Sequence, residues 1–194
     1  MKIDKNVIDY WDNRYSKGRG SGVGSVGQEL GFKLDIIGKF SDKKIDSILD
    51  IGCGDMSLGS SLFNMFPNAN YIGLDVSKSV IKRANDKFAS EKRTFSIVSD
   101  YSLILKADLV ICMDVLFHQL NDNEYFGLIK FLRNCYNKYL FISEYPDGIK
   151  EKNLDKMIKY RKFDPELLGN NFECIRIPTR SNEKFLYVFE KQLC

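Results

Sequence analysis

The stretch Ile48-Leu49-Asp50-Ile51-Gly52-Cys53-Gly54-Asp55 is an apolar run that leads into a turn with two glycines. The apolar run predicts a buried strand, and glycine lets the backbone bend sharply and approach a ligand closely. Residues 58–66, which follow the turn, have the apolar spacing of a helix that stops at Pro67. A strand, a glycine turn and a helix start with unpaired N–H groups together predict a nucleotide-like ligand at this turn.

Strand-like and helix-like segments alternate through the rest of the chain. We expect strands at 45–51, 71–74, 94–98, 108–113, 139–143, 172–177 and 184–190, and helices at 7–15, 32–40, 77–89, 121–136, 154–162 and 165–168. This alternation predicts an α/β fold, a Rossmann-like doubly wound sheet of about seven strands that is mostly parallel with an antiparallel last strand. We expect a single domain over 1–194, with a helical, Gly-rich cover at 1–44 and the Rossmann-like core at 45–194.

Composition excludes several classes of protein. The chain has 194 residues, 44% apolar and 28% charged, with a net charge of +3, which is typical of one ordinary globular domain. Its five cysteines form no CxxC pair and no Cys/His spacing suited to a metal, so we expect no metal and reduced thiols in a cytoplasm. The sequence has no apolar run that could span a bilayer, so we expect no membrane partner.

Asp75 ends the expected strand at 71–74, about 20 residues after the glycine turn. A carboxylate at this point can bind both ribose hydroxyls, although a helix-capping aspartate before Ser77 is the alternative interpretation. A dinucleotide would need a third close glycine, which the turn lacks, and Asp55 would repel its pyrophosphate. A literal GxGxxG match at 22–27 has no strand before it and therefore carries little weight.

Two further strand ends carry polar side chains. Asp100 and Tyr101 follow the third strand, where a carboxylate can accept from an adenine amino group or lie in a surface loop. Asp114 ends the fourth strand, and His118, the one histidine of the chain, follows it. An imidazole suits a general base near neutral pH, although a packing histidine is the alternative. Asp114 could orient His118, line the methionine end of the cofactor, or itself be the base.

Together, Asp50-Ile-Gly-Cys-Gly-Asp55, Asp75, Ser99-Asp100-Tyr101 and Asp114 resemble the class I S-adenosylmethionine-dependent methyltransferases over residues 45–143. The resemblance implies S-adenosylmethionine as cofactor and S-adenosylhomocysteine as its product. It places Asp50, Gly52 and Gly54 around the methionine moiety, Asp75 at the ribose and Asp100 near adenine. We also predict that Cys53, Val76, Tyr101 and Met113 bind the cofactor.

A narrower likeness involves Trp11-Asp-Asn-Arg14-Tyr15, the Gly-rich segment at 21–27, Phe32-Lys33, Asp114-Val-Leu-Phe-His118 and residues 160–163. These look like a group of small bacterial methyltransferases without a settled substrate, some of which belong with surface-polysaccharide genes. The likeness implies that the N-terminal segment lies over the cofactor, so we predict that Trp11, Arg14 and Tyr15 bind it. A second histidine expected near residue 159 in that group is missing here.

The end of the fourth strand lacks the motifs of DNA methyltransferases, and this absence guides the prediction of the methyl acceptor. Asp114-Val-Leu-Phe117 has no Asp-Pro-Pro-Tyr pattern, and no Pro-Cys nucleophile is present, so we expect no DNA substrate. The compact chain favours O-methylation of a small sugar-linked or phosphorylated metabolite, a surface-polysaccharide precursor being one option. We predict that Arg19, Ser21, Tyr145 and Arg161 bind it, with Lys17, Lys162 and Arg180 as further basic residues. The alternatives are an RNA or protein methyltransferase and a non-catalytic cofactor-binding regulator.

Overall fold

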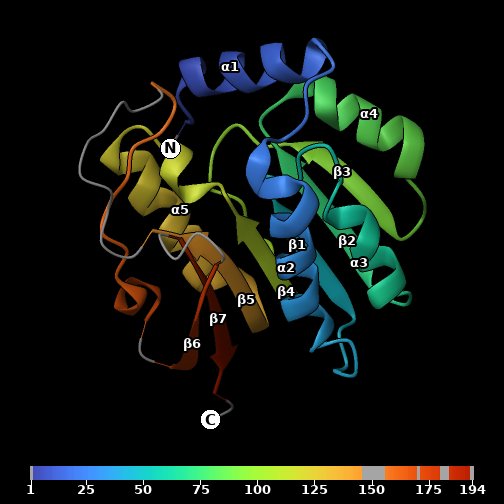
Figure 1. Ribbon diagram of the computed structural model, residues 1–194, viewed down its shortest axis with the longest axis vertical. Helices are drawn as coiled ribbons and strands as arrows, with labels where there is room; N and C mark the ends of the chain where they lie inside the picture. Colours follow the sequence, from blue (N-terminus) through green and yellow to red (C-terminus); the bar gives the residue numbers. More distant parts are fainter. Residues whose placement is uncertain (1, 146–155, 170, 180–183, 193–194) are drawn as a thin grey trace.

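A seven-stranded sheet in the order β3-β2-β1-β4-β5-β7-β6 forms the centre of the molecule (Figure 1). The computed structural model describes residues 2–145, 156–169, 171–179 and 184–192. The strands are β1 (Ser47–Ile51), β2 (Asn70–Asp75), β3 (Arg93–Ile97), β4 (Ala107–Met113), β5 (Tyr136–Glu144), β6 (Phe172–Pro178) and β7 (Phe185–Lys191). The helices are α1 (Lys5–Ser16), α2 (Gly27–Gly38), α3 (Gly59–Met65), α4 (Lys78–Phe88) and α5 (Asp122–Cys135), with 3₁₀ turns η1 (Val23–Ser25), η2 (Leu116–His118) and η3 (Pro165–Leu168).

Strand direction follows the predicted pattern. The first five strands pair in parallel, whereas β7 runs antiparallel to both β5 and β6. Every residue of β4 is buried, which explains its unbroken apolar sequence. The prediction of a mostly parallel, Rossmann-like sheet with an antiparallel last strand is confirmed. Strand order reverses between β1 and β4, which is where open α/β sheets bind ligands.

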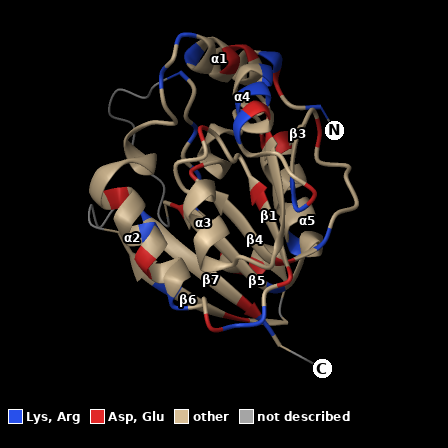
Figure 2. Ribbon diagram, turned by 90° about the vertical axis from the view of Figure 1, so that its right-hand side faces the viewer, with Lys and Arg blue, Asp and Glu red and all other residues tan. Residues whose placement is uncertain are grey.

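Helices cover both faces of this sheet. Leu128 and Leu132 of α5 belong to the apolar cluster on one face, and the other face packs against Ile37 of α2, Leu62 of α3 and Val80 of α4. The helical segments thus bury the apolar stripes from which they were predicted. Lys and Arg are interspersed with Asp and Glu along α1, α2 and α4, so these helices present no single-sign surface (Figure 2).

Helix α1 lies across the carboxyl ends of the parallel strands (Figure 1). Ile3 N–H donates to Ser99 O at 2.9 Å, which ties the start of the chain to the loop after β3. The Asp12 carboxylate accepts from Ser77 Oγ and from Ser79 N–H, both at 2.8 Å, at the first turn of α4. Because these contacts join α1 to two loops at the strand ends, the N-terminal segment forms a cover over that edge of the sheet.

One predicted helix is wrong. Residues 156–162 of the helix expected at 154–162 form a turn and irregular backbone, and 154–155 lie outside the described residues. Lys159 N–H donates to Phe117 O at 2.8 Å, so tertiary contacts with η2 replace the helical hydrogen bonds that the apolar spacing suggested. Among the described residues, no helix is long and apolar enough to cross a membrane.

Candidate active site

The turn after β1 is fixed by its backbone. Gly52 N–H and Cys53 N–H both donate to Leu74 O of β2, at 2.7 and 3.0 Å. Gly52 and Gly54 have positive φ angles of 72° and 53°. A Cβ on Gly52 would also collide with the side chain of Val115. Glycine is therefore required at Gly52 both by the backbone conformation and by its neighbour.

Asp50 is a buried carboxylate at the carboxyl end of β1. Tyr71 OH donates to its Oδ2 at 2.5 Å. Burial raises the pKa of Asp50 to about 6, against the lowering effect of the Tyr71 hydrogen bond. Because the buried carboxylate has a phenol donor and, within the part of the chain that the structure describes, forms no ion pair, it suits a cationic ligand group.

Asp75 lies one strand away, at the carboxyl end of β2. Its carboxylate accepts from Gly54 N–H at 3.0 Å and from Ser77 N–H at 2.9 Å. Burial raises the pKa of Asp75 to about 6, while these backbone donors lower it. Ser77 itself caps α4, since its Oγ accepts from Val80 N–H at 3.2 Å. Asp75 is thereby left at the turn, oriented by two amides, rather than serving as the helix cap.

The Gly-rich segment is bound to the same turn through Ser21. Ser21 N–H donates to Asp55 Oδ2 at 2.8 Å, and Asp55 N–H donates to Ser21 Oγ at 3.1 Å. Tyr15 OH lies 3.0 Å from Ser21 Oγ. Asp55, which was predicted to repel a pyrophosphate, thus also binds the Gly-rich segment to the turn.

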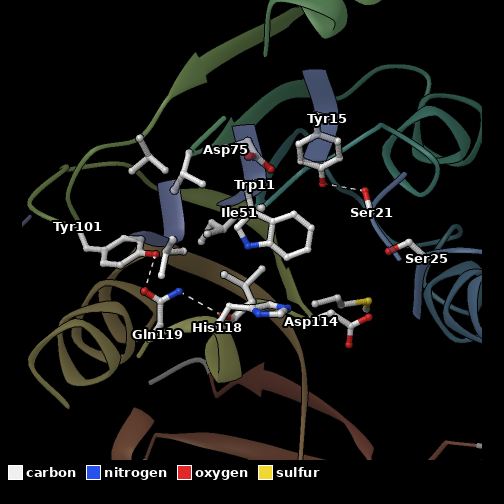
Figure 3. A pocket seen from close by; sticks show the side chains of 16 residues that line it. Trp11, Tyr15, Ser21, Ser25, Ile51, Asp75, Tyr101, Asp114, His118 and Gln119 are labelled. Carbon is white, nitrogen blue, oxygen red and sulfur yellow. Dashed lines mark hydrogen bonds between the residues drawn. The ribbon is translucent and has the colours of Figure 1, made fainter. Parts of the chain in front are cut away.

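Trp11 projects from α1 into the space beneath the cover (Figure 3). Its indole stacks on Tyr15 with the ring centroids 5.7 Å apart and meets the imidazole of His118 edge-on at 5.0 Å. The Arg14 guanidinium lies 5.9 Å from the indole centroid, and its Nε donates to Gly20 O at 2.7 Å. Arg14 therefore supports the indole and the Gly-rich segment.

A cavity of about 70 Å³, the main cavity, lies under Trp11 at the ends of β1, β2 and β4 (Figure 3). A smaller side recess adjoins it, and the two share Ser21, Ser25, Gly52 and Met113. Of the predicted cofactor residues, the main cavity is lined by Trp11, Tyr15, Gly52, Asp75, Val76, Tyr101 and Met113, and the side recess by Asp50, Gly52, Cys53 and Met113. The structure thus brings most of the predicted set together at the switch point.

His118 enters the main cavity from η2. Its Nδ1 lies 2.7 Å from Met157 O, and because a carbonyl only accepts, Nδ1 carries the proton of the neutral ring. The lone pair is then on Nε2.

Asp114 follows β4 with the left-handed φ of 59°, a conformation uncommon outside glycine. Its carboxylate accepts from Lys33 Nζ at 2.5 Å, Lys184 Nζ at 2.8 Å and Ser143 Oγ at 2.8 Å. Burial opposes the charge, yet the two ammonium groups lower the pKa of Asp114 to about 2. Burial lowers the pKa of Lys33, and so does the positive charge of Lys184, which lies at the same carboxylate; the charge of Asp114 acts in the opposite direction.

Tyr101 lines the main cavity, whereas its neighbour Asp100 does not. Tyr101 lines the main cavity, and its OH donates to Gln119 Oε1 at 3.2 Å (Figure 3). Asp100 is not among the lining residues of that cavity. Its carboxylate accepts from Ser102 N–H at 2.9 Å and from Ser102 Oγ, which lowers the pKa of this exposed carboxyl.

Three of the four predicted acceptor residues line neither cavity among the described residues. Arg19 is exposed. Arg161 donates to Asp122 at 3.0 Å and to Gln119 O at 2.7 Å, and its guanidinium lies over the Tyr125 ring. Tyr145 packs edge-on against Tyr160, and Ser21 is the predicted acceptor residue that lines both cavities. Arg180 lies outside the described residues. Arg19 and Arg161 therefore line neither cavity, and their role at the acceptor stays a prediction.

Sequence reasoning missed Lys33, Lys184 and Gln119. Lys33 sits in an amphipathic helix as an apparently exposed charge, yet it is only 3% exposed. Lys184 directly precedes β7 and lies 70 residues beyond Asp114, so no local spacing links the two. The sequence signal for Lys33 was that Phe32-Lys33 belongs to the likeness with small bacterial methyltransferases, which implied no role for this lysine.

Comparison with known proteins agrees with this geometry. The sequence model of a methyltransferase domain family matches residues 49–139, from β1 to the start of β5. The chain carries a domain of the class I S-adenosylmethionine-dependent methyltransferase family. The predicted family is confirmed, and so is its cofactor, at the level of the family.

Relatives of this methyltransferase domain vary in length. A curated malonyl-[acyl-carrier protein] O-methyltransferase of Ilyobacter polytropus is 32% identical over 113 residues, covering 56% of this chain and 42% of the relative. The chain thus spans about two fifths of that protein.

Solved structures match nearly the whole chain. The magnesium protoporphyrin IX methyltransferase of Synechocystis with bound S-adenosylmethionine has a TM-score of 0.69 and 22% identity, covering 96% of each chain. A methyltransferase from Anabaena variabilis has a TM-score of 0.70 and 18% identity, covering 99% of this chain and 98% of its own. At sequence identities of 18–22%, the structural similarity shows a shared fold.

Proposed function

We propose that the chain transfers the methyl group of S-adenosylmethionine to an oxygen atom of a small-molecule acceptor. The observation that carries the proposal is the convergence of Gly52, Asp75, Trp11 and His118 on one cavity at the switch point. The O-methyltransferase name of the curated relative supports oxygen as the acceptor atom.

The residues present fit this cofactor. Asp75 offers a buried carboxylate to the ribose hydroxyls, and the flat apolar surroundings of Val76, Val98 and Tyr101 suit adenine. Because the Asp100 carboxylate binds Ser102, we assign the adenine end to Tyr101 and to Gln119.

The cover must shift to admit the ligand. Ligand sites usually measure about 300–1,000 Å³, whereas the main cavity measures about 70 Å³. Trp11 stands over the cavity, so we expect the indole to move outward on binding and to exclude water once the cover closes.

The sulfonium supplies an already activated methyl group, so the protein must position the acceptor and take up a proton where the acceptor is a hydroxyl. His118 fits the second task, since its Nδ1–H donates to Met157 O and the lone pair of Nε2 can accept the proton. Asp114 does not, because its pKa is about 2 and both carboxylate oxygens bind lysines. We therefore propose that His118 is the base and that Asp114 positions the lysines.

Transfer of labelled methyl from S-adenosylmethionine to small molecules tests the proposal. Suitable pools are hydroxylated phospho-metabolites, nucleotide sugars and malonyl thioesters, which separate the phosphorylated and sugar-linked acceptors from the acceptor that the relative's name describes. His118→Asn is the matched variant, because the Asn amide keeps a donor near the position of Nδ1 and lacks the base. For a hydroxyl acceptor we expect a loss of about 10²–10⁴-fold in kcat with unchanged cofactor affinity.

Other outcomes identify other functions. Methyl transfer to RNA or protein alone, with strongly salt-dependent binding, would replace the small-molecule acceptor. Tight cofactor binding with no transfer to any pool would favour a cofactor-binding regulator.

A further inference from the structure

Segment 156–162 runs beside η2 and is bound to it through alternate residues. The hydrogen bonds that join them are His118 Nδ1 to Met157 O at 2.7 Å, Lys159 N–H to Phe117 O at 2.8 Å, and Arg161 Nη1–H to Gln119 O at 2.7 Å. Each of the consecutive residues 117–119 therefore has a partner in the segment. His118 and Gln119 also line the main cavity, so the segment holds two residues of that cavity (Figure 3).

The Arg161 guanidinium anchors this segment. Its Nε and Nη2 both donate to Asp122 Oδ1 at 3.0 Å, while Nη1 donates to Gln119 O. The guanidinium lies over the Tyr125 ring, 4.6 Å from its centroid, and the side chain is only 12% exposed. Because a guanidinium presents its N–H groups in fixed directions, this one side chain joins the end of η2 to the first residue of α5.

Met157 O decides which nitrogen of His118 carries the proton. A carbonyl oxygen only accepts, so the contact at 2.7 Å requires N–H on Nδ1 and leaves the lone pair on Nε2. Since segment 156–162 is irregular backbone, its contacts with η2 and α5 fix its position, and Met157 lies only four residues before Arg161. The place of this carbonyl therefore depends on the anchor.

We propose that Arg161 is a positioning residue for His118. By binding the end of η2 and the first residue of α5, its guanidinium holds segment 156–162 in place, and Met157 O thereby keeps the imidazole proton on Nδ1. In this role Arg161 acts through the imidazole, whereas the sequence predicted that it binds the acceptor itself. The consequence for catalysis rests on the proposed function, in which Nε2 takes up the proton of the acceptor.

Nuclear magnetic resonance of the imidazole tests the structural step, because His118 is the one histidine of the chain. Isotope-labelled histidine distinguishes the ring nitrogen that carries a proton from the one that has a lone pair, at an alkaline pH where imidazole is neutral. We expect Nδ1–H in the wild-type chain. Arg161→Met keeps an apolar stem over Tyr125 and should show both tautomers, because the Met157 carbonyl is no longer held.

Lys159→Met is the matched control. The Lys159 ammonium binds the same Asp122 oxygen at 2.9 Å, but its side chain is 46% exposed and its contact with η2 is made by the backbone N–H, which the substitution keeps. This variant should retain the wild-type tautomer. Asp122→Ala removes the α5 end of the anchor while Asn121 still caps the helix, so it should shift the tautomer ratio in the same direction as Arg161→Met. It decides the question if Arg161→Met does not fold.

Methyl transfer to the acceptor found for the proposed function tests the catalytic step. We expect Arg161→Met to lower kcat by about 10–100-fold, no more than His118→Asn does, with the KM of the acceptor and the affinity for S-adenosylmethionine within about twofold of wild type. Because both changes act through one imidazole, adding Arg161→Met to His118→Asn should slow the reaction no further.

A wild-type imidazole that carries its proton on Nε2, or an Arg161→Met chain that keeps the wild-type tautomer, would overturn the inference. A higher acceptor KM with unchanged kcat would also overturn it, and would instead place Arg161 at the acceptor. So would a further loss in the double variant, which would show a role independent of His118. Absence of methyl transfer to any pool would refute the proposed function, and the tautomer measurement would then decide the positioning role alone.

Discussion

Replacement of Asp114 by Asn tests the electrostatic arrangement at the end of β4. The side chain of Asp114 is 16% exposed, and its carboxylate neutralises Lys33 and Lys184, which are 3% and 8% exposed. An amide at the same position removes the carboxylate that forms ion pairs with both buried ammonium groups. We therefore expect Asp114→Asn to fold with clearly reduced stability.

Two estimates give the magnitude. Breaking a buried ion pair by removing one partner costs about 3–5 kcal/mol. The lowering of the pKa of Asp114 from 3.8 to about 2 corresponds to roughly 2–3 kcal/mol from its ionised form. Because the pKa is lower in the folded state, this contribution is present above pH 3.8 and is lost as the pH falls towards 2. For a chain of this size, 3 kcal/mol lowers Tm by roughly 6–12 °C.

Urea unfolding followed by far-ultraviolet circular dichroism measures the effect. The control is Asp86→Asn, which removes an exposed i,i+4 pair with Lys82 and should change stability by less than about 0.5 kcal/mol. Adding Lys184→Met to Asp114→Asn removes one of the two unmatched cations and should restore part of the loss. An Asp114→Asn chain as stable as the control, or a double variant less stable than the single one, would refute the reasoning.

Three other changes have defined outcomes. Burial raises the pKa of Glu144 from 4.5 to about 8, so the stability that neutral Glu144 contributes should be fully present below pH 4.5 and be lost as the pH rises through 8; Glu144→Gln should flatten the fall in stability between pH 6 and 8 in urea titrations and add roughly 2–4 kcal/mol at pH 8, and an unchanged slope there would contradict this. Gly52→Ala should cost about 2–4 kcal/mol through its left-handed backbone and the collision with Val115, whereas Gly31→Ala, with open space inside α2, should add about 0.5–1 kcal/mol; equal effects in urea unfolding would argue against the required glycine. Asp12→Ala should cost about 1 kcal/mol through the lost hydrogen bonds to Ser77 and Ser79 at the start of α4 and should speed cleavage of α1 by trypsin, and an unchanged cleavage rate would show that the cover is held elsewhere.

Local patterns predicted most of the fold and about half of the site. The strand, glycine turn and acid at Asp50, Gly52 and Asp75 follow one another in the chain, so their meeting at one sheet edge follows from parallel topology. The contacts of Asp114 do not, because Lys33 lies 81 residues before it and Lys184 lies 70 residues after it. Arg161 was predicted at the acceptor for its charge, yet Asp122 on α5 binds it. Long-range pairing of charges is set by tertiary packing, which apolar periodicity does not encode.

Calorimetric titration with S-adenosylmethionine and with a nicotinamide dinucleotide tests the central claim most directly. We predict one S-adenosylmethionine site per chain, weakened at least tenfold by Asp75→Asn, since the amide has no charge and only one acceptor oxygen where the buried carboxylate offers two to the ribose hydroxyls. The dinucleotide should give no heat of binding, because the turn at Gly52 and Gly54 lacks a third close glycine and Asp55 stands beside it. Tight binding of the dinucleotide, with no response to S-adenosylmethionine, would contradict the account.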